Sequence, residues 1–167
     1  MLVIGIDPGT AITGYGLVRE SEDGILSLVD YGAIVTSPDK AMNLRLLELY
    51  SHLKDLLLLH QPDCGAVEKL FFARNVRTAL TVGQARGVVL LALAELDVPL
   101  GEYTPLEVKQ AVAGYGGADK NQVQQMVRAL LGLAEVPHPD DAADALAIAI
   151  CHLHSARLRE LGRGATA

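Results

Sequence analysis

Apolar and polar positions in the first sixty residues predict three strands and a helix. Residues 2–7 form a short apolar run that ends in an acid, and residues 12–19 and 25–35 are two more strand-like segments joined by the polar turn ESEDG. In residues 37–60 the apolar side chains recur every three or four positions, which predicts a helix capped by Ser37 with Pro38 at its first position. Its expected apolar face consists of Met42, Leu46, Leu49, Leu53, Leu56 and Leu57.

The rest of the chain alternates between strand-like and helix-like segments. We expect a strand at 64–70 (CGAVEKL), a helix at 74–96, a strand at 99–103, a capping box at 104–107 (TPLE) that opens a helix, a glycine loop at 114–120 (GYGGADK) that leads into another helix, and a last helix at 137–154. Three strands that fit antiparallel pairing, followed by alternating helices and strands, predict an α/β fold with a mixed sheet flanked by helices.

Length and composition favour one domain. The chain has 167 residues, of which 50% are hydrophobic, and we expect a domain at 1–155 and a short flexible tail at 156–167. No apolar run is long enough to span a membrane, and Asp7 interrupts the first one before it could serve as a signal peptide, so we expect a cytoplasmic protein. Cys64 and Cys151 form no C-x-x-C pair and are expected to be buried free thiols.

The formal net charge of −6 does not exclude a nucleic-acid partner, because the charges are unevenly distributed. The stretch from Lys69 to Ala94 contains Lys69, Arg74, Arg77 and Arg86 and no acidic residue. If the acids elsewhere bound two divalent cations, the net charge would change from −6 to about −2.

Four acids lie where predicted strands end or a predicted helix begins. Asp7 ends the first strand, Glu68 is near the end of the fourth, and Asp141 and Asp144 are one helical turn apart. Asp7 could be a turn residue, Glu68 could pair with Lys69 at a sheet edge, and Asp141 could interact with the helix dipole. Asp144 lies in a helix that is apolar nearly all round, so it faces burial unless it is paired. Together the four suggest carboxylates that converge on hard cations.

Five segments, in order along residues 1–154, resemble the RuvC family of Holliday-junction resolvases. They are GIDPGTAITGYG (5–16), EKLFFARN (68–75), GQARGV (83–88), VKQAVAGYGGADKNQVQQMV (108–127) and DAADALAIAI (141–150). The resemblance implies a ribonuclease H-like fold with a five-stranded mixed sheet. It also implies a homodimeric endodeoxyribonuclease that resolves four-way DNA junctions by paired symmetric nicks in recombination and repair, in partnership with the RuvA–RuvB branch-migration complex.

The same resemblance assigns a catalytic metal site to Asp7, Glu68, Asp141 and Asp144. It implies two Mg²⁺ ions per subunit, with Mn²⁺ as a substitute, and hydrolysis by a two-metal mechanism. Some members of the family have His in place of Asp141. His138 is therefore either a proton shuttle or a surface or capping residue, and Asp140 is an alternative to Asp141.

The resemblance also indicates DNA-binding residues. Lys109 and Lys120 match family lysines, Lys120 being close to a helix N-terminus, and their alternative is a solvated surface. Phe71 is the expected base-stacking residue, the alternative being that Phe71 and Phe72 both lie in the core. Arg74 and Arg77 join this set from the acid-free stretch.

Gly83 and Gly87 lie one turn apart and indicate close packing of their helix, either in a dimer or on its own sheet.

Two other classes of protein share parts of this pattern. GIDPGT also resembles the phosphate loop of actin-like and sugar-kinase ATPases, which need two such domains to enclose a nucleotide. A junction-binding module without catalysis is the other alternative, and the complete set of acids argues against it.

Overall fold

The computed structural model describes residues 1–69 and 76–164, the side chains of 76–78 and 158–164 excepted. Its elements are β1 (Leu2–Asp7), β2 (Ile12–Glu20), β3 (Leu26–Val35), α1 (Met42–His60), β4 (Cys64–Glu68), α2 (Val76–Glu95), β5 (Leu100–Tyr103), α3 (Pro105–Ala113), α4 (Lys120–Leu130) and α5 (Asp140–Gly164). In the described part of the chain, no helix has both the length and the apolar character needed to cross a membrane.

The five strands form one mixed sheet in the order β3-β2-β1-β4-β5. β1, β2 and β3 pair antiparallel in a meander, whereas β4 pairs parallel to β1 and β5 parallel to β4. This arrangement confirms the predicted α/β class and the five-stranded sheet of a ribonuclease H-like fold.

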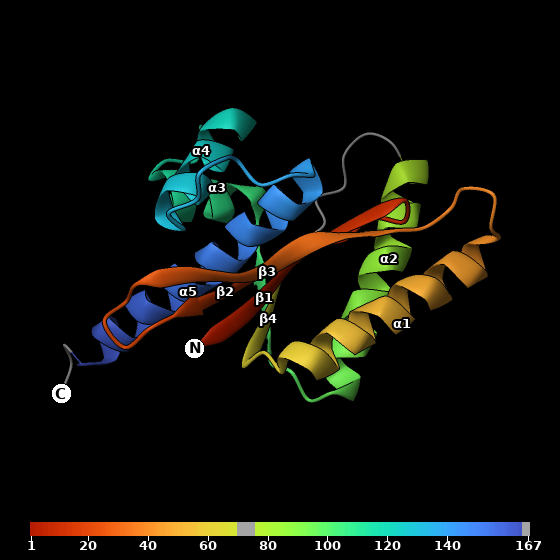
Figure 1. Ribbon diagram of the computed structural model, residues 1–167, viewed down its shortest axis with the longest axis horizontal. Coiled ribbons are helices and arrows are strands. Elements are labelled where there is room, and N and C mark those ends of the chain that lie inside the picture. The colour runs from red at the N-terminus through yellow and green to blue at the C-terminus, as the bar shows by residue number, and fades with distance from the viewer. Residues whose placement is uncertain (70–75, 165–167) are drawn as a thin grey trace.

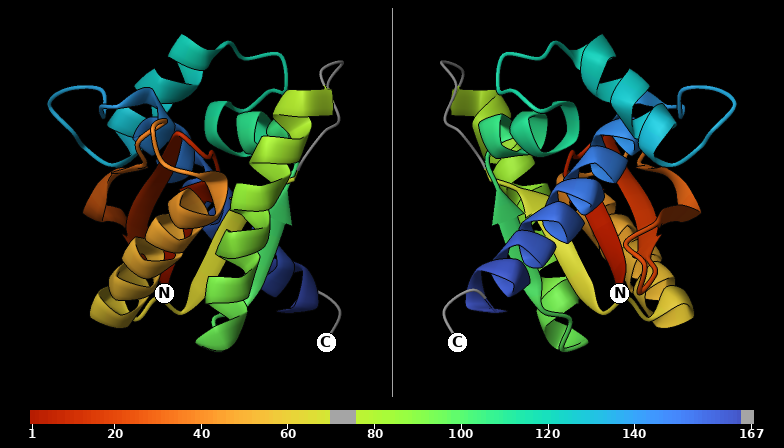
Figure 2. Two further views of the ribbon diagram at one scale, coloured as in Figure 1. Left: turned by 90° about the vertical axis from the view of Figure 1, so that its right-hand side faces the viewer. Right: turned by 90° about the vertical axis from the view of Figure 1, so that its left-hand side faces the viewer.

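Helices cover both faces of the sheet (Figures 1 and 2). α1 and α2 pack on one face, and α5 crosses the other with α3 and α4 beside it. Alternate side chains of β1 point to opposite faces of the sheet. Leu2, Ile4 and Ile6 belong to the core under α1 and α2, and Val3 belongs to the core under α5. By the same alternation, Asp7 falls on the face that carries α5.

Close packing against glycines places α5 on the sheet. A methyl group at Gly5 of β1 would overlap the carbonyl oxygen of Ala145, and one at Gly14 of β2 would overlap the carbonyl oxygen of Asp141. Gly14 is paired with Asp7 across the β1–β2 ladder. The absent side chains therefore let the first turns of α5 lie directly over the end of β1.

The predicted start of the first helix is wrong. The helix begins at Met42, and the preceding SPDK segment forms a turn in which the Ser37 hydroxyl accepts a hydrogen bond from the Asp39 amide at 3.2 Å. Ser and Pro favour such turns as strongly as they favour helix starts, and here the turn connects β3 to α1.

Other predicted boundaries differ by a few residues. β4 ends at Glu68, although the prediction ran to residue 70. α5 begins at Asp140 rather than at residue 137 and continues to Gly164, well past residue 154. The helix therefore passes through the boundary expected at residue 155. Cys64 and Cys151 are buried free thiols, as expected.

Candidate active site

Three of the four predicted acids line one cleft. Asp7 ends β1, Glu68 ends the neighbouring strand β4, and Asp144 lies in the second turn of α5. The cleft has a volume of about 220 Å³, and Lys109 of α3 and Lys120 of α4 also line it. Because parallel strands end at the same edge of the sheet, β1 and β4 present their carboxylates side by side under α5.

Burial and mutual repulsion disfavour the charged forms of these acids. Burial first, and then the negative charges of Asp144, Glu68 and Asp141, raise the pKa of Asp7 to about 7. Burial and the charge of Asp144 raise the pKa of Glu68, against the opposing effect of Lys109. Burial also raises the pKa of Asp144, although Lys120 opposes it. A cluster of carboxylates with raised pKa values in a cleft is typical of a functional site.

Asp141, the fourth predicted acid, does not line the cleft but lies close to it. Its backbone carbonyl faces Gly14, the ladder partner of Asp7, and its charge contributes to the raised pKa of Asp7. Asp140, the alternative to Asp141, is more than half exposed and pairs with Lys120 at 3.2 Å. The neighbouring Lys120 ammonium lowers the pKa of Asp140, with a smaller contribution from the exposed His138.

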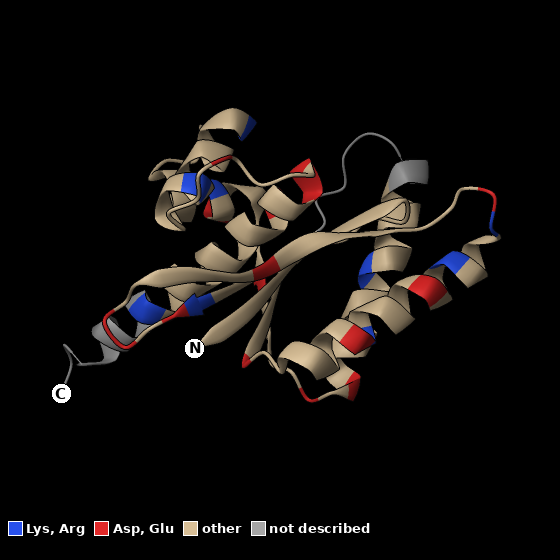
Figure 3. Cartoon of the chain, in the orientation of Figure 1, with Lys and Arg blue, Asp and Glu red and all other residues tan. Residues whose placement is uncertain are grey.

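Lys120 connects α4 to the acids of α5. Its ammonium lies 3.0 Å from Asp144 and 3.2 Å from Asp140, so one cation is shared by two carboxylates. These hydrogen bonds and charges raise its pKa against the opposing effect of burial. Lys120 is the first residue of α4, as expected, and the Asp119 carboxylate caps that helix by accepting from the Gln122 amide at 2.8 Å. Figure 3 shows the acidic start of α5 and the basic residues on the helices beside it.

The chemistry of these donors fits a hard divalent cation. Asp7, Glu68 and Asp144 offer only carboxylate oxygens, the ligands that Mg²⁺ and Mn²⁺ prefer. Their mutual repulsion is relieved when a cation enters. Within the described residues, no three His, Cys, Asp or Glu side chains lie close enough together, as they stand, to hold a metal ion. Lys120 contacts only one carboxylate oxygen of Asp144, Oδ2.

Three of the predicted DNA-binding side chains lie outside the described part of the structure. Phe71 and Arg74 fall in residues 70–75, and Arg77 belongs to α2 with a side chain that is not described. Lys109 and Lys120 are the predicted basic residues that the structure places at the cleft.

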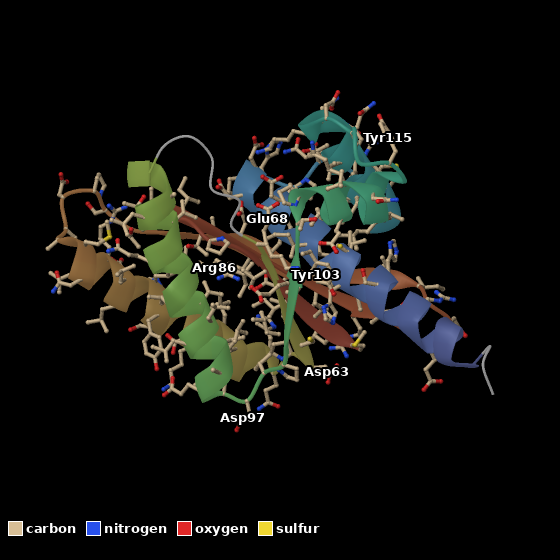
Figure 4. All side chains as sticks on the ribbon, turned by 180° about the vertical axis from the view of Figure 1, so that it is seen from behind. Asp63, Glu68, Arg86, Asp97, Tyr103 and Tyr115 are labelled. Atoms are coloured by element: carbon tan, nitrogen blue, oxygen red, sulfur yellow. The ribbon has the colours of Figure 1, made fainter. Side chains whose placement is uncertain are left out.

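The sequence interpretation missed a contact between α2 and the end of β4 that carries Glu68. The Arg86 Nε donates to the backbone carbonyl of Glu68 at 3.4 Å, and its guanidinium also pairs with Glu102 of β5. Figure 4 labels Glu68, Arg86 and Tyr103 and shows α2 beside these strands. The sequence shows Arg86 only as part of an acid-free stretch, because a contact to a backbone carbonyl leaves no pattern in the sequence.

Comparisons with known proteins agree with this geometry. A family profile described as "Crossover junction endodeoxyribonuclease RuvC" matches residues 3–152. Proteins of that name from Syntrophomonas wolfei and Chloroflexus aggregans are 58% and 62% identical to this chain, over 95% and 93% of its length and 91% and 94% of theirs.

Solved structures show the same likeness. A Thermus thermophilus RuvC in complex with Holliday junction substrate matches with a TM-score of 0.90 and 41% identity, over 95% of this chain and 96% of that one. The yeast mitochondrial Holliday junction resolvase Ydc2 shares the fold, with a TM-score of 0.66 at 16% identity. The described cleft and this likeness, which extends over nearly the whole chain, lead to one conclusion: the chain belongs to the RuvC family of crossover junction endodeoxyribonucleases.

Proposed function

We propose that this chain resolves four-way DNA junctions by metal-dependent hydrolysis, with Asp7, Glu68, Asp141 and Asp144 as its metal-binding carboxylates. One observation carries the assignment of the site: acids from β1, β4 and α5, far apart in the sequence, line a single cleft beside two lysines. The Thermus relative in complex with a Holliday junction supports the assignment of the substrate.

The proposed cofactor is Mg²⁺, two ions per subunit, with Mn²⁺ as a substitute. Such ions supply an activated water and stabilise the leaving 3′ oxygen when they are bound between carboxylates. Four carboxylates provide enough negative charge for two divalent ions, and the raised pKa values of Asp7, Glu68 and Asp144 support the need for cations in the cleft.

The chain's own cations have a separate role. The ammonium of Lys120 is charged at neutral pH, and it would be available to a DNA phosphate if Asp144 held a metal ion. Lys109, which also lines the cleft, lowers the pKa of Glu68 and offers a second positive charge. Phe71, Arg74 and Arg77 are proposed to extend this surface along the DNA.

A homodimer is the proposed assembly, with α2 at its centre. The exposed residues in the described part of α2 include Leu80, Gln84, Gly87, Leu91 and Ala94. Their spacing of four and three residues places them on one side of the helix, and Leu80 and Leu91 are 64% and 61% exposed. Nothing lies within 4 Å of a methyl group placed at Gly87, so a second helix could approach closely there. Two sites related by a two-fold axis match the symmetry of the junction.

Two further proposals rest on the family resemblance. The RuvA–RuvB branch-migration complex is the expected partner, and a chromosomal junction as substrate places the enzyme in the cytoplasm.

The test compares a four-way junction with a duplex of equal length in Mg²⁺. We expect tighter binding of the junction and cleavage of the junction alone. The Asp7→Asn variant should cut at least 100-fold more slowly, which corresponds to about 2.7 kcal/mol, and should still bind the junction. Asp23→Asn, the same change at an exposed hairpin residue, should cut normally.

Three results would overturn this proposal. Near-normal cutting by Asp7→Asn would refute the active site. Junction binding without any nicking would favour the non-catalytic binding module, and ATP turnover without DNA would favour the nucleotide-binding alternative.

A further inference from the structure

The pairing between β1 and β4 stops just short of the acids that these strands carry. The parallel ladder ends with the pair Ile6 and Val67, one residue before Asp7 and Glu68. Asp7 is paired only on its other side, with Gly14 of β2. The position of its carboxylate therefore depends on the loop of residues 8–11, which follows it directly.

Arg45 and Thr36 hold this loop from the side of the sheet that α1 covers. The terminal Nη2 of Arg45, in the first turn of α1, donates to the Thr10 carbonyl at 2.9 Å, and its Nε donates to the Thr36 hydroxyl at 2.9 Å. The Thr36 hydroxyl donates in turn to the same Thr10 carbonyl. Thr36 is only 3% exposed and Arg45 is half-buried, so these bonds are partly shielded from water.

A second buried threonine, Thr13, forms hydrogen bonds with the backbone of the same loop at Gly9. The Thr13 hydroxyl donates to the Gly9 carbonyl at 2.7 Å and lies 3.3 Å from the Gly9 amide, which donates to it. Thr13 is 1% exposed. The loop is thus bonded at Gly9 and at Thr10, the second and third residues after Asp7.

Arg45 makes these contacts without a carboxylate partner. Within residues 1–69 and 79–157, whose side chains are described, it forms no ion pair. Two of its five N–H donors bind the Thr36 hydroxyl and the Thr10 carbonyl. A lysine, with a single compact ammonium, cannot reproduce this planar two-point contact.

We propose that Arg45 is a positioning residue for catalysis: through Thr36 and the Thr10 carbonyl it holds the loop of residues 8–11, and thereby the Asp7 carboxylate, in the geometry that metal binding needs. The inference rests on the proposed role of Asp7 as a metal ligand. It predicts an effect on the rate rather than on DNA affinity, because the contacts of Arg45 are made within the protein. A displacement of about 1 Å in a catalytic group can cost about 100-fold in rate.

The test measures the cleavage rate at saturating protein, the junction Kd, and the Mg²⁺ concentration that gives half the maximal rate. For Arg45→Gln we expect a rate 10- to 100-fold lower, a Kd within threefold of the wild-type value, and a higher Mg²⁺ requirement. Arg45→Lys should restore little of the rate. Arg19→Gln is the matched control, because Arg19 is exposed and pairs with Leu2 at the opposite end of the ladder.

Thr36 supplies a second, gentler test. Thr36→Val keeps the shape of the side chain but removes the hydroxyl, and it should slow cleavage about tenfold. Thr36→Ser keeps the hydroxyl and should cut at the wild-type rate. This pair keeps the proposal falsifiable even if Arg45→Gln fails to fold.

The contrary outcomes are distinct. A wild-type cleavage rate for Thr36→Val would overturn the positioning role. So would an Arg45→Gln variant that cuts at the normal rate when protein is saturating but binds the junction more weakly and therefore cuts less at low protein. That second result would make Arg45 a DNA contact. Normal cutting by Asp7→Asn would instead refute the proposed active site itself.

Discussion

Replacing Asp7 by Asn should stabilise the metal-free protein above pH 7. The pKa of Asp7 is raised from 3.8 to about 7, mainly by burial and then by its acidic neighbours. Between these two pH values the folded state keeps the proton on Asp7 and the unfolded state releases it, so stability falls as pH rises. Below pH 3.8 the carboxyl is protonated in both states and the penalty disappears.

The size of the effect follows from the shift. One pKa unit corresponds to about 1.4 kcal/mol, so a rise from 3.8 to about 7 corresponds to about 4 kcal/mol of unfolding free energy. Since part of this energy is shared with the neighbouring acids, we expect Asp7→Asn to gain about 2–4 kcal/mol at pH 8. In a chain of this size, such a gain raises Tm by about 5–15 °C.

The assay is denaturation in EDTA at pH 4 and pH 8, at one protein concentration because dimerisation also contributes to stability. The variant should be more stable than the wild type at pH 8, and most of this gain should be lost at pH 4, close to the ordinary pKa of 3.8. Adding Mg²⁺ at pH 8 should stabilise the wild type more than the variant. Asp23→Asn should change the unfolding free energy by less than about 0.5 kcal/mol. Two results would refute the conclusion that the raised pKa of Asp7 destabilises the metal-free protein. One is a variant that is no more stable than the wild type at pH 8, and the other is a gain in stability that is as large at pH 4 as at pH 8.

Four other changes test the packing, the cation, the metal and the dimer. Gly14→Ala should push against the Asp141 carbonyl, lower cleavage at least tenfold and cost about 1–3 kcal/mol of stability; Gly117→Ala, which has room for a methyl group, should do neither. Lys120→Ala should slow cleavage at saturating protein more than it weakens junction binding; parallel losses with a normal saturated rate would make Lys120 a plain phosphate contact. Ca²⁺ should support binding in a gel-shift assay but not cleavage, because its looser coordination positions the water poorly. Leu91→Glu on the exposed side of α2 should produce monomers in sedimentation analysis, and an intact dimer would exclude that face as the interface.

Hydrophobic periodicity predicted the fold well because each face of the sheet has its own helical layer. The strands alternate between the α5 layer and the α1–α2 layer, and α5 is apolar nearly all round because it packs on the sheet and on α3 and α4. The start of α1 was missed because Ser37 and Pro38 form a turn rather than a cap. Local residue preferences do not distinguish these two uses of the same side chains.

The acids of the site were predictable because they interrupt apolar patterns. Asp7 and Asp144 stand out in the sequence as carboxylates in segments that are otherwise buried. Arg45 and Arg86 do not stand out, since an arginine on a helix usually faces solvent. Their contacts to the carbonyls of Thr10 and Glu68 depend on how the helices pack against the strand ends, which only the folded structure specifies.

Cleavage of a supercoiled plasmid that extrudes a cruciform tests the proposed resolvase most directly. A dimer with two active sites of the kind described should cut both strands across the junction in Mg²⁺ and convert the plasmid to linear molecules, with little accumulation of open circles. Asp7→Asn should leave the plasmid supercoiled. Accumulation of open circles by the wild-type protein, or linear product from Asp7→Asn, would contradict paired cleavage by this cluster of acids.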